Sequence, residues 1–549
     1  MLNSKYQTAG FSGHSAGNFV LIKYLLILLF SSSAFPVDGQ KSQPERPNII
    51  IILADDIGYG DLSCYGAKSV QTPAIDSLAK SGIRFINAYS CASTCTASRY
   101  GLLTGHYPWR RKETSIARGD APMLINPGQS TVASFLKYSG YVTGVVGKWQ
   151  LGLGEGGYNK QAWNDSITPG PKQIGFDYSF IMAASADMVP SVFIENQRIV
   201  GLSKNDPIQL DYPNPFKDEP TGKTNPELLK LIPDDDHNHA IVNGISRMGN
   251  MKGGRSALWV DENIADTITA KAVRFIEKNK DHPFFLYFCT NDIHVPRVPH
   301  PRFIGQTTMG VRGDAIVEFD WSVSQIMDVL KRLGLDKNTL IILSSDNGPV
   351  VEESYKDQSR EKLGNHTPGG PLLGGKYSAF EAGTRVPFLV SWPGKVNPGT
   401  KNAMISQIDL MATLSALVNR TLPAGSAPDS YNELNVWLGN SNRNRDFIVE
   451  QSIGTISVIE RYNKYIEPSS GPIREIHSKI ELGNDPDPQL YNLREDRAEQ
   501  RNLARQYPAK VKVLAEKLKD IKTGKFVRPG INEPKEKIEY RLAKLKHNE

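Results

Sequence analysis

The sequence predicts an α/β fold in which helices cover both faces of a large, mostly parallel β-sheet, followed by a smaller antiparallel sheet with a helix. Two observations predict the large sheet: short apolar runs end abruptly in polar residues, and helical patterns alternate with these runs along the chain. A change of texture after about residue 430 predicts the smaller C-terminal part.

The apolar runs are rich in Val, Ile, Leu and Phe, as expected of strands that are buried on both faces. In an open, doubly wound sheet, ligands bind beyond the carboxyl ends of the strands. Because each run ends at polar residues, we expect the functional site at that edge. The predicted strands cover residues 48–53, 141–146, 284–288 and 340–343, and the predicted helices cover 74–81, 130–139, 264–279 and 313–333.

The remaining segments complete the predicted organisation. Residues 155–260 are irregular and rich in Pro, Gly, Asp and Asn, which favours a functional insertion that forms walls of a substrate site. In the C-terminal part, strands are expected at 447–450, 456–460 and 465–467, with a turn at 484–488. A helix follows, with one face made by Val511, Leu514, Leu518 and Ile521. The predicted domains are a signal peptide (1–40), a catalytic domain (46–430) and a C-terminal subdomain with a charged tail (431–549).

The N-terminus and the composition indicate an exported globular protein. Lys5 and Lys23 precede an apolar run at 24–30, and small residues follow at 31–34, which is typical of a secretory signal peptide and too short to span a bilayer. We therefore expect a periplasmic or extracellular protein without stable membrane insertion. The net charge of +6 is spread along the chain, which argues against a nucleic-acid partner. Four cysteines are too few for a disulfide scaffold.

Two polar pairs at strand ends predict a metal site. Asp55 and Asp56 follow the first predicted strand, and Asp346 and Asn347 follow the strand at 340–343. Three carboxylates and an amide oxygen suit a hard cation, calcium before magnesium. A single Asp-Asp pair is more often a solvated turn, but two such pairs that each close a buried strand favour the metal.

Cys95 is the candidate nucleophile. The segment around it changes from polar to apolar, which places Cys95 near a helix N-terminus, where anions bind favourably. Arg99 lies four residues on, on the same helix face. By spacing alone, a buried structural cysteine is an equal alternative.

These segments, taken together, resemble the type I sulfatases. Residues 94–105 (Thr-Cys-Thr-Ala-Ser-Arg through Leu-Thr-Gly) are similar to that family's Cys-x-Pro-Ser-Arg signature, whose cysteine is oxidised to formylglycine. One match would be weak, but further matches follow in family order between about residues 46 and 505. They are the metal loops at 51–61 and 345–349, Gly-Lys-Trp-Gln-Leu-Gly at 147–152, His-Val-Pro at 294–296, Gly-Gly-Lys at 374–376, Arg-Val-Pro at 385–387 and Leu-Tyr-Asn-Leu at 490–493.

The resemblance implies an alkaline-phosphatase-like fold and a sulfuric ester hydrolase. It is closest in pattern to bacterial polysaccharide sulfatases, so the implied substrate is a sulfated carbohydrate. A formylglycine-generating maturase is the implied partner, because it would convert Cys95 to 3-oxoalanine, whose hydrate attacks sulfur.

The resemblance also implies a role for each matching residue. Arg99 would orient the formylglycine, Lys148 and Lys376 would bind the sulfate oxygens, and His294 would protonate the leaving alcohol. The calcium ligands would be Asp55, Asp56, Cys95, Asp346 and Asn347.

Two positions depart from the family pattern. Ala97 stands where the signature usually has Pro, which leaves open which maturase acts. Gln150 stands where the family has a catalytic His, and Gln cannot take up a proton at neutral pH. We retain Gln150 as a catalytic position. Ser185, beside Asp187, is a further substrate-binding candidate, with solvation as its alternative.

Two other functions remain open from the sequence. The same superfamily contains phosphonate and phosphodiester hydrolases with similar metal sites. Ala97 and Gln150 would also suit a weakly active, glycan-binding sulfatase-like protein.

Overall fold

The computed structural model describes residues 46–443 and 445–528. The predicted signal peptide and the charged tail from residue 529 lie outside the described residues. No helix within the described ranges is both long and apolar enough to cross a lipid bilayer. The predicted boundary between residues 430 and 431 stays a prediction.

The strand β1 (Asn48–Ala54) lies at the centre of the large sheet and is buried along its whole length. Its successive side chains enter opposite cores: Ile49 and Ile51 pack in one, and Ile50 and Ile52 pack in the other. The period of two along a strand explains why a sheet covered on both faces requires a continuous apolar run.

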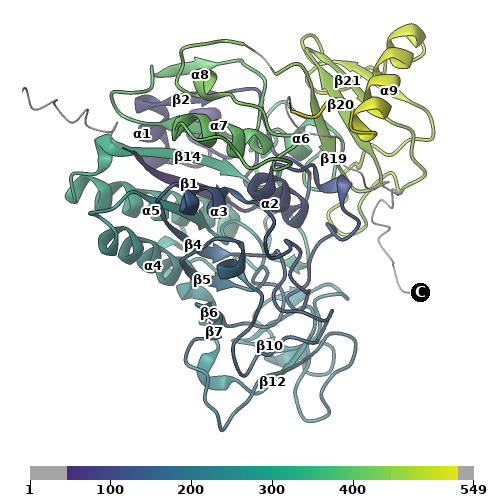
Figure 1. Cartoon of the computed structure of the whole chain (residues 1–549). Helices are drawn as coiled ribbons and strands as arrows, with labels where there is room; N and C mark the ends of the chain where they lie inside the picture. Colours follow the sequence, from purple (N-terminus) through teal and green to yellow (C-terminus); the bar gives the residue numbers. More distant parts are fainter. Residues whose placement is uncertain (1–45, 444, 529–549) are drawn as a thin grey trace, which may run out of the picture. The chain divides into compact units, whose positions relative to one another are not determined.

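The large sheet has a parallel centre and antiparallel additions at both sides. Strands β14, β1, β13, β4 and β5 are parallel neighbours, whereas β16 and β6 pair antiparallel to β14 and β5. Figure 1 shows the sheet running from β2 through β1 and β4 to β7. Its order is β17 (Gly399–Lys401), β2 (Ile83–Phe85), β16 (Phe388–Ser391), β14 (Thr339–Ser345), β1, β13 (Phe284–Cys289), β4 (Val142–Lys148), β5 (Tyr178–Met182), β6 (Phe193–Glu195) and β7 (Arg198–Ile199).

Helices cover both faces of this sheet, as predicted. One core is shared by α1 (Pro73–Ser81), α4 (Ile264–Lys278) and α5 (Gly310–Arg332), and Figure 1 shows α4 and α5 along one side of the strands. The other core contains α2 (Cys95–Thr104), α3 (Val132–Tyr138), α7 (Leu410–Leu417) and α8 (Leu434–Trp437). A short helix, α6 (Glu381–Thr384), precedes β16.

The insertion at 155–260 is not wholly irregular. It contributes β5, β6 and β7 to the edge of the large sheet, and these strands were not predicted because they are short and weakly patterned. Its strand β9 pairs with β15, just after the second predicted metal loop. The small paired strands are β3 (Ala88–Tyr89), β8 (Gln209–Asp211), β9 (Ile232–Pro233), β10 (Ile241–Val242), β11 (Ile245–Ser246), β12 (Asn250–Lys252), β15 (Tyr355–Lys356) and β18 (Ile405–Ser406).

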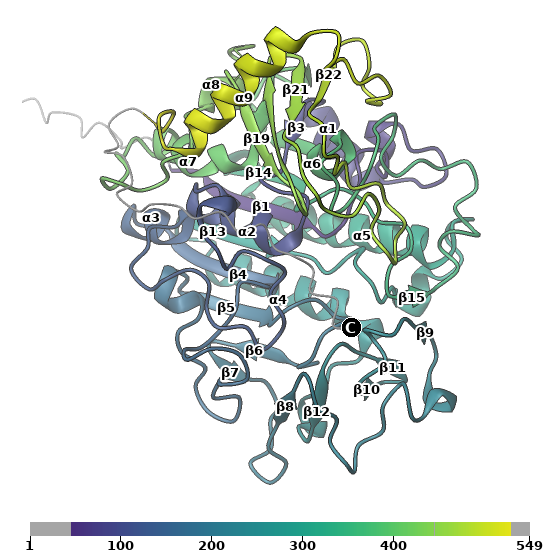
Figure 2. The same cartoon turned by 90° about the vertical axis from the view of Figure 1, so that its right-hand side faces the viewer.

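The C-terminal part is a four-stranded antiparallel sheet covered by a helix, as predicted. The helix α9 (Pro508–Lys522) buries Leu514, Leu518 and Ile521 against the sheet, with Val511 partly buried beside them. Figure 2 shows α9 across β19 and β21. The strands are β19 (Ile448–Gln451), β20 (Ile456–Glu460), β21 (Asn463–Ile466) and β22 (Gln489–Asn492), of which the last was recognised only as a family signature.

Candidate active site

The register of the parallel strands brings the two polar pairs together. Ala54, the last residue of β1, lies opposite Ser345, the last residue of β14. Asp55 and Asp56 therefore emerge beside Asp346 and Asn347 at one edge of the sheet, which is the arrangement that the sequence predicted. All four residues are buried.

The grouped side chains fit a hard cation. One ligand atom from each of Asp55, Asp56, Asp346 and Cys95 lies within 4.8 Å of the others. Asn347 donates a hydrogen bond from Nδ2 to Asp56 Oδ1 at 2.7 Å, while its buried Oδ1 has no hydrogen-bond partner within the described part of the chain. An orphaned amide oxygen beside three buried carboxylates is the oxygen-rich donor set that calcium binds.

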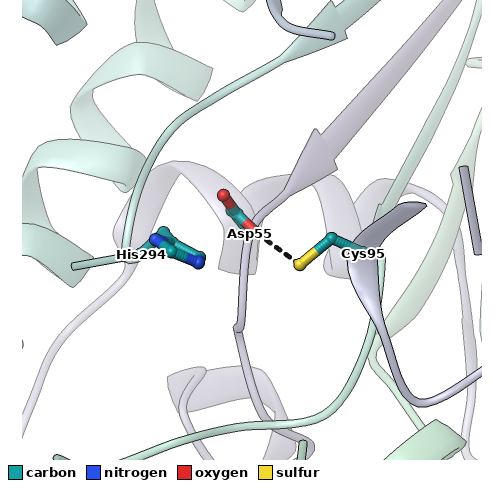
Figure 3. A group of neighbouring side chains, drawn as sticks. All are labelled: Asp55, Cys95 and His294. Atoms are coloured by element: carbon teal, nitrogen blue, oxygen red, sulfur yellow. Dashed lines mark hydrogen bonds between the residues drawn. The ribbon is translucent and has the colours of Figure 1, made fainter. Parts of the chain in front are cut away.

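Cys95 is the first residue of α2, as the sequence predicted, and its Sγ lies 3.8 Å from Asp55 Oδ1. Figure 3 shows Asp55 between Cys95 and His294. Burial holds the pKa of the Cys95 thiol well above its ordinary value. An unmodified Cys95 is therefore a protonated thiol and a weak nucleophile.

Arg99 fixes the start of α2 to the metal loops. Its Nε donates to Asp346 Oδ2 at 2.9 Å, and its Nη1 donates to the carbonyl oxygen of Lys148 at 3.1 Å. The side chain is completely buried. A buried guanidinium with this fixed geometry positions Cys95 against the carboxylates.

Two lysines pair with the predicted calcium ligands. Lys148, at the end of β4, places Nζ 2.5 Å from Asp55 Oδ2. Lys376 places Nζ 3.0 Å from Asp56 Oδ2 and 2.8 Å from Glu353 Oε2. Burial alone would lower the pKa of Lys376, but Asp56 and Glu353 hold it well above its ordinary value. Both lysines therefore carry positive charge into the site.

His294 presents one nitrogen to the cluster. Its Nδ1 donates to the carbonyl oxygen of Val295 at 2.7 Å, because a carbonyl can only accept. Nε2 is then the acceptor, 3.1 Å from Lys376 Nζ. Burial and the charges of Lys376 and Lys148 lower the pKa of His294 to about 4.

Gln150 and Ser185 lie at the margin of the carboxylate cluster. Gln150 is buried with φ of 51°, and its Oε1 has no hydrogen-bond partner in residues 46–443 and 445–528. Ser185 donates its hydroxyl to Asp187, whose Oδ1 lies 3.9 Å from His294 Nδ1. Among the described residues, neither side chain forms a hydrogen bond with the carboxylate cluster, and Ser185 is linked to the site through Asp187.

The structure adds residues that sequence reasoning missed. Glu353 binds Lys376 and also accepts a hydrogen bond from the hydroxyl of Tyr377. His237 joins Asp187 to Asp234, and these hydrogen bonds raise its pKa to about 10 although burial opposes this. The only available signal for Glu353 was proximity in sequence, because it follows the second metal loop (345–349) by four residues.

The comparisons with known proteins agree on one family. The family model described as Sulfatase matches residues 47–419. An N-acetylgalactosamine-6-O-sulfatase of Bacteroides thetaiotaomicron is 52% identical over 88% of this chain and 94% of its own length. Human arylsulfatase A is 30% identical over 69% of this chain and 65% of its own length.

Solved structures show the same fold. A Bacteroides thetaiotaomicron protein, described with the metabolism of multiple glycosaminoglycans, superposes with a TM-score of 0.86 at 52% identity, covering 87% of this chain and 99% of that one. A phosphonate monoester hydrolase of Agrobacterium radiobacter has a TM-score of 0.53 at 16% identity, covering 88% of this chain and 96% of that one, which shows the fold alone.

Proposed function

The chain belongs to the sulfatase family, and from this premise we propose that it removes the 6-O-sulfate from N-acetylgalactosamine in sulfated carbohydrates. It is a sulfuric ester hydrolase. The observation that carries the proposed substrate is the 52% identity with an N-acetylgalactosamine-6-O-sulfatase over nearly the whole of both chains. The buried cluster of Cys95, carboxylates and lysines supports the chemistry.

We propose that Asp55, Asp56, Asp346 and Asn347 hold calcium and that Cys95 is converted to formylglycine by a maturase. Calcium and the formylglycine hydrate would supply a Lewis acid and an oxygen nucleophile. The orphaned Asn347 Oδ1 and the raised pKa of the Cys95 thiol support this assignment. The proposed export of the protein would place it where sulfated polysaccharides occur.

The other residues then have defined tasks. Lys148 and Lys376 would bind the sulfate oxygens and share negative charge as it develops. Nε2 of His294 would face the departing alcohol, because Nδ1 is held by the Val295 carbonyl, and it would pass on a proton taken up from Lys376 Nζ, 3.1 Å away. Arg99 would hold residue 95 in place. Gln150 would offer a hydrogen bond but no base.

The test is sulfate release by the protein co-expressed with a formylglycine-generating maturase, in the presence of calcium. The substrates are N-acetylgalactosamine 6-sulfate, N-acetylglucosamine 6-sulfate, N-acetylgalactosamine 4-sulfate and matched aryl sulfate and phosphate esters. We expect the first substrate to give the highest kcat/KM. The variant Cys95→Ala should lose about 10⁴-fold or more of the rate, and calcium chelation should also abolish release.

Cys64→Ala is the matched control, because Cys64 is a partly buried thiol away from the cluster, and it should keep full activity. A preference for another sugar would overturn the proposed substrate. Preference for phosphate esters would favour a phosphodiester hydrolase. Glycan binding without turnover, with formylglycine confirmed at position 95, would favour a binding protein.

A further inference from the structure

A pocket lies where the C-terminal sheet meets the large domain, and none of its lining residues belongs to the group of carboxylates, lysines and Cys95 described above. It has a volume of about 300 Å³. Its floor comes from the segment around β3 and from Arg385, just after α6, and its rim comes from the β20–β21 turn and the segment after β22. Figure 2 shows β3 and α6 beside the C-terminal sheet. The lining residues are Asn87, Tyr89, Arg385, Asn402, Arg461, Tyr462, Leu493, Arg494 and Arg497.

The pocket is cationic, and no carboxylate lines it. Four arginines line it, and we call this site the arginine pocket (Arg385, Arg461, Arg494 and Arg497). Arg385 is buried and pairs with Glu381 at 2.9 Å. The other three are exposed, and none has a carboxylate within ion-pair distance among the described residues.

Among the described residues, the exposed Glu495 forms no ion pair with these arginines, and two other acidic residues nearby in the sequence have partners outside the pocket. Asp496 accepts the backbone N–H groups of Gln500 and Arg501. Glu460 binds Lys517. Three guanidinium groups around one hollow therefore repel one another without a direct ion-pair partner among the described residues, and an anionic ligand would relieve this repulsion.

Two neutral features favour a carbohydrate as the carrier of that anion. Tyr462 is 37% exposed at the rim, and the guanidinium of Arg494 lies 5.7 Å from its ring centre. The side-chain amide of Asn87 offers Nδ2 as a donor on the floor, because its Oδ1 accepts from Tyr89. An aromatic ring with several N–H donors suits a sugar ring that bears sulfate or carboxylate groups.

We propose that the arginine pocket binds an anionic sugar unit of the sulfated glycan chain outside the active site. This deepens the proposed function and rests on it, since a polymeric substrate carries many anionic units. A long glycan chain that binds both the active site and the arginine pocket gains affinity through effective concentration, whereas a monosaccharide can occupy only one of the two sites. The pocket would therefore distinguish polymer from monosaccharide.

The experiment compares the double variant Arg494→Gln/Arg497→Gln with the control Arg501→Gln/Arg505→Gln, which removes the same charge from exposed positions outside the pocket. Binding is measured by calorimetry in the Cys95→Ala background, so that the glycan probe keeps its sulfate groups during the measurement. The probe is a glycosaminoglycan polymer with 6-sulfated N-acetylgalactosamine. Turnover is measured in the active background on the polymer and on free N-acetylgalactosamine 6-sulfate.

We expect the pocket variant to weaken polymer binding by about tenfold or more and to lower kcat/KM on the polymer alone. The control variant and monosaccharide turnover should not change. Unchanged polymer binding, or equal weakening by the control, would overturn the proposal. Equal loss of affinity for single-stranded DNA of matched charge would overturn the assignment to a glycan. Binding in the Cys95→Ala background is independent of turnover, so failure of the proposed sulfatase substrate leaves this test intact.

Discussion

Two buried clusters of charge in this protein solve the same electrostatic problem differently. The active-site cluster (Asp55, Asp56, Asp346, Glu353, Arg99, Lys148 and Lys376) sets four carboxylates against three cations. The Lys464 cluster (Lys464, Glu381, Glu450, Glu499 and Arg385) sets three glutamates against two cations, with Lys464 Nζ within 3.4 Å of all three.

Each cluster contains a buried oxygen without a hydrogen-bond partner among the described residues, Glu499 Oε1 in one and Asn347 Oδ1 in the other, and the difference lies in their surroundings. In the Lys464 cluster, the surplus acid retains a proton, because burial raises the pKa of Glu499 to about 8. The active-site cluster keeps an orphaned oxygen on Asn347 and places its lysines on ligand atoms that calcium would take. Buried charge alone therefore does not identify a catalytic site, whereas unmet acceptors at the ends of parallel strands do.

The largest expected effect is a loss of catalytic activity, which only substitutions in the active-site cluster should cause. Lys376→Met should lower kcat/KM for the sulfated sugar by about 10²–10³-fold, because the variant loses a cation that we propose to bind the sulfate oxygens. Thermal unfolding with calcium present should change little, since the proposed calcium ion would compensate the charge of Asp56. Steady-state kinetics and calorimetry measure both, with the exposed Lys395→Met as a control. Retained activity would remove Lys376 from the catalytic set.

Lys464→Met should show the opposite pattern. It leaves three glutamates in a buried space without their central cation, which should lower the free energy of unfolding by about 3–5 kcal/mol. Denaturant titration measures this loss. Lys510→Met in the same subdomain, where Lys510 contacts Asn463 from an exposed position, should change stability little. Unaltered stability in Lys464→Met would mean that the Lys464 cluster does not stabilise the fold, and the contrast between the two clusters would not hold.

The smallest effect concerns pH. The pKa of Glu499 rises from an ordinary value of 4.5 to about 8, first through burial and then through Glu381, against the opposing charge of Lys464. Folding therefore takes up a proton. The stabilisation that this proton uptake contributes is fully present below about pH 4.5 and is lost as the pH rises through 8.

Glu499→Gln mimics the protonated acid and removes this dependence. Melting temperatures of wild type and variant, compared at several values from pH 5 to pH 9, should diverge in favour of the variant as the pH rises. Parallel curves would show that Glu499 titrates normally in the fold.

Much of the fold could be predicted from sequence because it depends on local patterns. The apolar runs that became β1, β4, β13 and β14 had to be buried on both faces, and the change at Cys95 did mark the start of α2. The short strands β5 to β7 escaped prediction, because two to five residues carry too little pattern to distinguish a strand from a loop.

The sequence by itself determined which polar residues follow β1 and β14, and so the proposed metal ligands, whereas the roles of the two lysines came from the family resemblance. Only the tertiary structure decided their partners. Glu353 on Lys376, His237 on Asp187 and the arginine pocket join residues from distant segments. The physical reason is that strand periodicity acts over a few residues, whereas charge pairing depends on distances in space that the packing of the whole chain sets.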